Sequence, residues 1–429
     1  MKRVLRSAAV VALTALVATA RAGEVRWTGI ASVETRWYPR EEAAGRDLEW
    51  GPQAGLEIAW AISRNARAQI NPHIHWDPLD GGRWRAIPTE AWVETRSGRV
   101  RARVGRQTVA FGSALLFNPA DVAATRDWGL DFLDPPRPGD WAGVLAYGTS
   151  GWGFEIAALP VLEGAPLPGA RSPWSFEAAA RRQTGFDFEV TVLDEPRLPR
   201  GTSEVSGTGR VRVTHGSLDL YLTGYSGVDR VPVFLVSVAD LLVDPRVRAE
   251  AVYLPLHLIG VEVQTVTGGA VLHAAAAYRD QSTDDARIRR EVFEGSGLSP
   301  RSVQVALGGD YLLEGGVLGE GTLDLGMEVT FDDGARGDEL AFYRPLQRDL
   351  AVTAAFLLGD LPDTRVEAAW VQDLERDESV ASLRAARRIG SGLRLEVGGE
   401  VVRAPADTGS PLALYRANDR LVTRLSLVF

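Results

Sequence analysis

Regular alternation of polar and apolar residues runs through this chain and constrains its fold more than any other feature. In the segment 66–77 every second residue is polar or charged and the residues between them are apolar, and the segments 322–332 and 393–401 repeat the pattern. Successive side chains of a strand point to opposite faces, so such strands have one polar and one apolar face. They fit either a soluble β-sandwich with an apolar core or a membrane barrel with an apolar outer face and a polar lumen.

The spacing of the turns favours the membrane barrel. Short turns such as 97–98 and 390–392 mostly alternate with longer connections such as 111–140 and 227–249. Tight turns at one end and long loops at the other are typical of outer-membrane barrels. We count 20 candidate strands, among them the segments 173–182 and 186–194, and 18 is an equally acceptable number. The expected fold is therefore all-β, a transmembrane antiparallel β-barrel of about 18–20 strands over residues 23–429.

The N-terminus predicts export. Lys2, Arg3 and Arg6 precede an apolar run over residues 8–18, and the small-x-small sequence 20–22 follows. This is the pattern of a secretory signal peptide, here residues 1–22, and the run is too short to span a bilayer as a helix. Together with the barrel pattern it predicts the outer membrane of a Gram-negative cell.

Composition excludes several classes of function. The chain has no cysteine, which excludes disulfide scaffolds, thiolate metal sites and cysteine nucleophiles. Its net charge of −9 argues against nucleic-acid binding. His73, His75 and Asp77 share one strand face, but same-face neighbours lie ~7 Å apart, so we expect no metal site. Hydrolase and nucleotide-binding motifs are missing from the sequence, and we expect no cofactor and no enzymatic activity.

The last strand carries a second export signal. The chain ends on Phe429, and residues 421, 423, 425 and 427 share its face, whereas Arg424 and Ser426 lie on the opposite face. This resembles the terminal-strand signal that the barrel-assembly machinery recognises in Gram-negative outer-membrane proteins. The resemblance implies that machinery as a partner, beside the lipid of the membrane.

A short stretch resembles a known group of channels. The segment 104–112, with the sequence VGRQTVAFG, resembles the G-R-Q…(W/F)-G segment of porin-like families, including alginate-export-type channels. The sequence NPAD at 118–121 resembles an N-P-x-D segment in some of those barrels. The last ~80 residues also resemble the closing hairpins of that group. The resemblance implies a porin-like barrel and leaves the transported solute open.

Charged residues on strand faces are the candidate pore lining. An arginine on the lipid face would cost ~2–4 kcal/mol at mid-bilayer, so these side chains should face the lumen or lie near a membrane interface. The basic residues could attract anions as a wall, or they could simply pair with neighbouring glutamates. Arg106 is three residues from Arg103, so on a regular strand the two side chains would point to opposite faces. This predicts either a bulge at Gly105 or an Arg106 side chain at the membrane rim. The strand candidates are Arg67, Arg99, Arg101, Arg103, Glu90 and Glu94.

Two long connections are candidate obstructions. The segment 111–140 carries Asp121, Asp127 and Asp131 among large apolar residues that would be poorly placed in open water. We expect it to fold inward as a constriction loop, and a surface loop is the alternative. The segment 227–249 is expected to form a short apolar helix that plugs the mouth, and binding of an apolar ligand or a partner protein is the alternative.

These expectations combine into a porin-like channel for small hydrophilic solutes. If the loop aspartates face the arginine ladder, their charges nearly cancel, which predicts weak selectivity with a slight lean towards anions. Two alternatives remain open. The chain could be a barrel subunit or exit duct of an export or envelope complex, or an outer-membrane hydrolase.

Overall fold

The protein was analysed as a computed structural model. It describes residues 24–39, 48–77, 83–112, 118–131, 133–169, 171–175, 177–178, 189–239, 246–294, 298–315, 321–334, 348–358, 363–405 and 411–429. The expected signal peptide, residues 1–22, lies outside the described residues.

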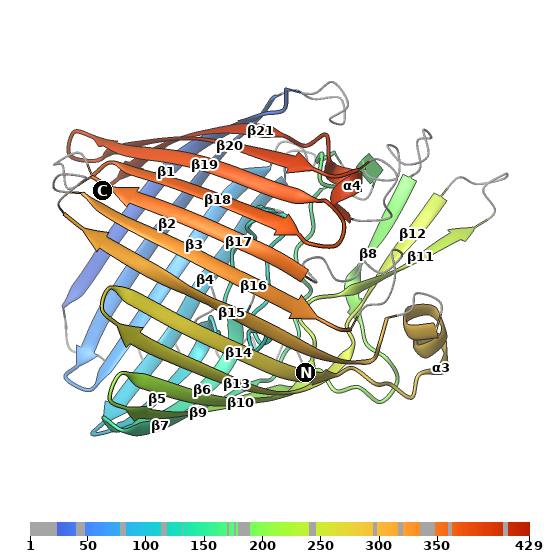
Figure 1. The fold of residues 1–429 in the computed structure, drawn as a ribbon, viewed down its shortest axis with the longest axis horizontal. Helices are drawn as coiled ribbons and strands as arrows, with labels where there is room; N and C mark the ends of the chain where they lie inside the picture. The colour runs from blue at the N-terminus through green and yellow to red at the C-terminus, as the bar shows by residue number, and fades with distance from the viewer. Residues whose placement is uncertain are drawn as a thin grey trace.

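Eighteen antiparallel strands form one sheet that closes on itself (Figure 1), which confirms the expected fold class. Closure comes from the last strand pairing with the first, for example Val33 with Leu425. In order around the barrel the strands are β1 (Val25–Trp37), β2 (Leu48–Ser63), β3 (Ala66–Asp77), β4 (Arg83–Ser97), β5 (Val100–Gln107), β6 (Asp140–Gly148), β7 (Trp152–Leu159), β9 (Ser206–His215), β10 (Leu218–Val228), β13 (Pro255–Thr267), β14 (Ala270–Asp280), β15 (Arg301–Glu314), β16 (Thr322–Asp332), β17 (Arg348–Leu357), β18 (Arg365–Asp373), β19 (Ser379–Ile389), β20 (Leu393–Arg403) and β21 (Arg420–Val428).

Two of the 20 candidate strands are not part of the barrel. The described residues of the segment 173–182 form turns and a short helical piece. The segment 186–194 overlaps β8 (Glu189–Arg197), which belongs to a separate three-stranded sheet with β11 (Val233–Ala239) and β12 (Arg246–Val252). Figure 1 shows this small sheet beyond the end of the barrel that carries the long connections, opposite the end with the short turns and the C-terminus.

The expected plug helix in 227–249 is wrong. Residues 233–239, with the sequence VFLVSVA, form β11 and pair with β12. An apolar run alone does not separate a buried helix from a strand, and this run is rich in valine, which favours strands. Besides the helical piece at residues 177–178, the helical elements described are α3 (Ala286–Ile288), the π-helix η1 (Arg289–Glu294) and α4 (Pro411–Tyr415). None of the helices in the described parts of the chain is long and apolar enough to cross a membrane.

The two faces of the wall differ in polarity. On β1 and β21 the outward side chains include Val33, Leu425 and Leu427, all exposed, whereas Glu34 lies inside and is buried. Trp27 and Trp37 project outward near the two ends of β1, ten residues apart. At ~3.3 Å per residue and a strand tilt of ~40°, that separation corresponds to an apolar band of ~25 Å, the height expected of an outer-membrane barrel.

An apolar core occupies one side of the lumen. Val109, Phe111 and Val122, from the connection between β5 and β6, pack against Leu256 and Leu258 on the inner face of β13. Burying a side chain of this size contributes ~1.5–3 kcal/mol, so the connection is held against this wall. The core thus lies on the β13 side of the lumen.

Candidate solute passage

The connection between β5 and β6 crosses the lumen from wall to wall. Near its start, Ala120 lies over Gly260 of β13, so close that a Cβ on Gly260 would come within 3.5 Å of the Ala120 methyl group. Further along, Asp131 pairs with Arg420 of β21. β13 and β21 lie nearly opposite each other in the strand order. The described part of the segment 111–140 is thus an inward loop, which we call the crossing loop, and not a surface loop.

A glycine–asparagine contact sets the start of the crossing loop. Gly112 has a φ of +115°, and a Cβ there would lie 1.2 Å from Nδ2 of Asn118. That amide nitrogen donates a hydrogen bond of 2.8 Å to the carbonyl oxygen of Phe111, and Oδ1 of Asn118 accepts one of 3.0 Å from the Ala120 N–H. Only glycine suits this backbone and this contact. The contact gives a physical reason for the F-G and N-P residues of the sequence motifs.

The far end of the crossing loop is held by buried arginine. Nη2 of Arg420 donates to both carboxylate oxygens of Asp131, at 2.9 and 3.0 Å, and Nε donates to Glu400 at 2.5 Å. Arg36 of β1 donates to the carbonyl oxygen of Leu130 at 2.9 Å. Burial by itself would raise the pKa of Asp131, but the charges of Arg420 and Arg36 hold it below its usual value.

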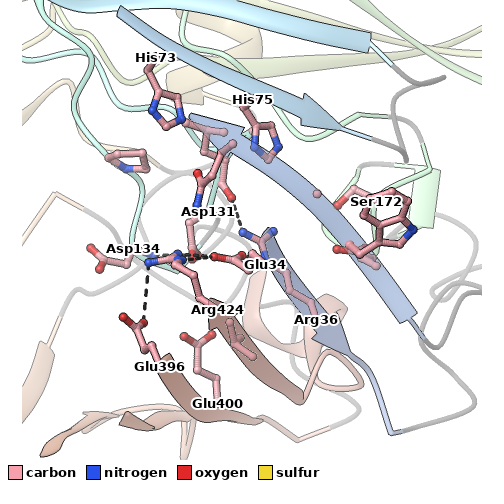
Figure 2. Close-up of a pocket in the computed structure, with 18 of the residues that line it drawn as sticks. Glu34, Arg36, His73, His75, Asp131, Asp134, Ser172, Glu396, Glu400 and Arg424 are labelled. Carbon is pink, nitrogen blue, oxygen red and sulfur yellow. Dashed lines mark hydrogen bonds and ion pairs between the residues drawn. The ribbon is translucent and has the colours of Figure 1, made fainter. Parts of the chain in front are cut away.

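A cavity of about 370 Å³ lies between residues 129–136 of the crossing loop and the inner wall. Figure 2 shows its charged side chains, with His73 and His75 on one side and Glu396 and Glu400 on another. The wall side is formed by β1, β2, β3, β19, β20 and β21, on the side of the lumen that the apolar core leaves unfilled. Its charged and titratable lining comprises Glu34, Arg36, Glu49, His73, His75, Asp131, Asp134, Arg384, Glu396, Glu400 and Arg424.

The arginines of this cavity are bound by carboxylates at short range. Arg36 and Arg424 reach Glu34 at 2.6 and 2.7 Å, and Arg384 reaches Glu400 at 2.8 Å.

Two carboxylates are held more loosely. Asp134 lies 3.8 Å from Arg384, and Glu396 lies 3.8 Å from Arg424. With Arg420 included, the lining has six carboxylates against four arginines. The cavity therefore carries a net negative charge when its histidines are neutral.

The predicted arginine ladder lies elsewhere in the lumen and is paired. Glu94 is buried between Arg67 at 2.9 Å and Arg103 at 2.6 Å, and the Arg103 guanidinium also stands 4.1 Å from the centre of the Trp92 ring. Arg101 pairs with Glu155 at 2.6 Å. These contacts match the pairing alternative and not the alternative of a free basic wall.

Arg99 does not belong to this wall. It lies in the β4–β5 turn and is exposed, because β5 begins at Val100. Glu90, by contrast, is on β4 and accepts hydrogen bonds of 3.3 Å from Gln69 and from the Trp92 ring.

The expected bulge at Gly105 is wrong, because β5 pairs residue for residue with β4 and β6 through Gly105 and Arg106, although the backbone at Gly105 is unusual. Gly105 has a φ of +134°, and a Cβ there would come within 2.2 Å of the Ala91 carbonyl oxygen. The irregular backbone turns Arg106 inward, where it is buried and pairs with Glu163 at 2.6 Å. The side chain is not at the membrane rim.

The three loop aspartates have separate roles. Asp121 pairs with Arg137 at 2.5 Å, and Asp127 pairs with Arg85 of β4 at 2.9 Å. Burial raises the pKa of both carboxyl groups. Asp127 lines a small adjoining cavity, whereas Asp131 lines the main one.

The sequence patterns do not single out several charged residues of this site, and four of them hold the loop or the wall in place. These four are Glu34, Arg36, Arg384 and Arg420. Their positions on strands β1, β19 and β21 alternate with mostly apolar residues, which is enough to predict that they face the lumen. Only the pairing of β1 with β21 shows that they lie close to one another.

Comparison with known proteins shows which solved structures have a similar fold. No family model and no curated protein sequence matches this chain. Among solved structures, OccK5 (OpdH) of Pseudomonas aeruginosa matches with a TM-score of 0.50 and 10% identity, over 95% of this chain and 97% of that one.

Two further matches have lower scores and 95% coverage of this chain. A loop-deletion mutant of OmpT, an outer membrane protein of Vibrio cholerae, has a TM-score of 0.43 and 10% identity, with all of that chain covered. A mutant of the Rh. blastica porin also has a TM-score of 0.43, with 12% identity and full coverage of that chain. With its closed 18-stranded sheet, this chain is a porin-like β-barrel of the outer-membrane type.

Proposed function

We propose that this protein is a passive channel for small hydrophilic solutes in the outer membrane. The observation that carries the proposal is the charged cavity between the crossing loop and the wall formed by β1–β3 and β19–β21. The loop and its apolar core fill the opposite side of the lumen, so solutes would pass beside residues 129–136. A volume of about 370 Å³ suits small polar solutes and hydrated ions and is far too small for a folded protein.

The proposed passage prefers cations weakly. Its arginines are engaged by Glu34, Glu400 and Asp131, whereas Asp134 and Glu396 lie 3.8 Å from the arginines they approach among the described residues. Selectivity is set where a pore is narrow, because field lines focus there and screening over ~8–10 Å mutes distant charges. We therefore propose a slight selectivity for cations, in place of the slight anion selectivity expected from Arg99, Arg101 and Arg103.

Planar-bilayer recording tests this proposal. Purified protein refolded in detergent should insert as discrete, lasting conductance steps. Its reversal potential in a potassium chloride gradient should show a small excess of potassium over chloride permeability. Lack of conductance from protein that shows heat-modifiable gel migration, and is therefore folded, would contradict the channel. Strong anion selectivity would contradict the assignment of the passage.

A further inference from the structure

We propose that His73 and His75 determine the charge selectivity of the passage and remove its preference for cations as the pH falls. The inference rests on the proposed channel function. At neutral pH the two imidazoles are uncharged and the passage favours cations. When both are protonated, the excess negative charge is cancelled and the preference for cations disappears.

Both histidines face the passage from the same strand. They alternate on β3 with Ile74, whose side chain points outward and is exposed. Both line the main cavity and the smaller one beside it. Figure 2 shows the two imidazoles side by side on β3, above the charged groups of β1 and the crossing loop.

Two glycines of the neighbouring strand leave room for the imidazoles. A Cβ on Gly51 would come within 3.4 Å of Cε1 of His75, and one on Gly55 within 3.5 Å of Nδ1 of His73. The rings lie over these two glycines, and Gln53, the cross-strand partner of His75, lies between the glycines on the inner face of β2. Both rings line the cavity through which the proposed passage runs.

The charged groups around the histidines are held in pairs. Asp127 of the crossing loop binds Arg85 of β4 at 2.9 Å, and Arg137 binds Asp121 at 2.5 Å. Glu49 of β2 accepts a hydrogen bond of 3.2 Å from Tyr38. The remaining groups facing the rings are Glu34 and Arg36 of β1, Asp131 and Asp134 of the loop, and the far wall with Arg384, Glu396, Glu400 and Arg424.

Protonation of two histidines is enough to cancel the excess negative charge of the cavity. Around the main cavity, with Arg420 included, six carboxylates face four arginines, which leaves two negative charges in excess. Histidine is the side chain whose ordinary pKa, about 6.5, lies between those of the carboxylates and arginine. Acidification from about pH 7.5 to about pH 5 therefore adds up to two positive charges before most of the carboxylates are neutralised.

Reversal potentials across this pH range test the inference. The ratio of potassium to chloride permeability should fall as the pH is lowered and reach about unity or below near pH 5. The double variant His73→Gln, His75→Gln should keep its cation preference throughout this range. His257→Gln is the matched control, because His257 lies on the outer face of β13, where it is exposed and contacts Ser226 at 3.0 Å. It should titrate like the unmodified protein.

The outcomes separate the two proposals. Conductance with a permeability ratio that does not change between pH 7.5 and pH 5 would overturn the role of the histidines and leave the channel intact. A double variant that titrates like the unmodified protein would do the same. Absence of conductance from folded protein would overturn both proposals. The single variants serve as a second measurement, and each should remove about half of the shift.

Discussion

Nη2 of Arg420 lies 2.9 Å from one carboxylate oxygen of Asp131 and 3.0 Å from the other. The two residues are separated by 289 positions in the chain, yet they join the last strand of the barrel to the loop that crosses its lumen. Arg420 is fully buried and also binds Glu400. This contact fixes one side of the proposed passage, so the position of the crossing loop depends on the closing strand.

Removing the Asp131 carboxylate should loosen the crossing loop. In Asp131→Ala the buried Arg420 keeps only Glu400, and the loss of a charged hydrogen-bond partner costs ~1–3 kcal/mol. Single-channel recording should show larger conductance and more open-channel noise than the unmodified protein. Glu24→Ala is the control, because Glu24 forms a fully exposed pair with Arg26, and such pairs add little to stability. Unchanged recordings from Asp131→Ala would show that Arg420 does not anchor the loop.

The two loosely held carboxylates should account for the cation preference. Asp134→Asn and Glu396→Gln keep the shape of the side chain and remove its charge, so each should lower the ratio of potassium to chloride permeability. The double variant should bring the ratio near unity. Glu155→Gln, which removes the partner of Arg101 away from this cavity, should change the ratio less. An equal effect of all three single variants would mean that selectivity is not set at this cavity.

Acidification should leave the crossing loop in place down to about pH 4. Burial raises the pKa of Asp121 and Asp127, so the cost of keeping them ionised in the folded loop is relieved as the pH falls through their raised values. The pKa of Asp131 is lowered, so its stabilisation is present above its unfolded value and is lost only as the pH falls through the lowered one. Open-channel noise should therefore stay constant from about pH 7.5 to about pH 4. A rise in noise above pH 5 would contradict this order of protonation.

Phe429 should matter more for assembly than for the assembled barrel. Its ring packs edge-on against Trp27, with the centroids 6.0 Å apart, and remains 56% exposed. Its backbone exchanges hydrogen bonds of 2.8 and 3.0 Å with Gly29, which any residue would keep. Phe429→Ala should lower the amount of folded protein in the outer membrane, whereas the purified variant refolded in detergent should keep heat-modifiable migration.

Leu427→Ala is the matched control for this prediction, because Leu427 is an exposed apolar side chain on the same face of β21. It should accumulate in the membrane at nearly the normal level. Equal accumulation of the two variants would show that the terminal aromatic residue is not read as a signal by the assembly machinery.

The strands of the barrel wall could be predicted from the sequence because polar and apolar residues alternate within each strand and so indicate which face is inside. The parity of Arg424 and Leu425, for example, is enough to place one inside and the other outside. The segment 186–194 shows the limit of this reasoning. Its pattern predicts a strand correctly, but β8 pairs with β12 in a small separate sheet, and pairing partners are not encoded in alternation.

The site was harder to predict for the same reason. Arg101 and Arg103 stand out in sequence as a ladder, but their effect depends on Glu155 and Glu94 on adjacent strands. Asp131 was among the predicted residues, whereas its partner Arg420 was not. Contacts across a lumen join residues far apart in sequence, and local patterns carry no information about them.

Thiol labelling gives the most direct test of the proposed passage, because the natural chain has no cysteine. Val422 lines the cavity on the inner face of β21, whereas its neighbour Thr423 lies on the outer, exposed face. A charged, water-soluble thiol reagent added during bilayer recording should sharply reduce the current through Val422→Cys and leave the current through Thr423→Cys unchanged. Full current through Val422→Cys after mass spectrometry has shown complete labelling would contradict a passage between the crossing loop and this wall.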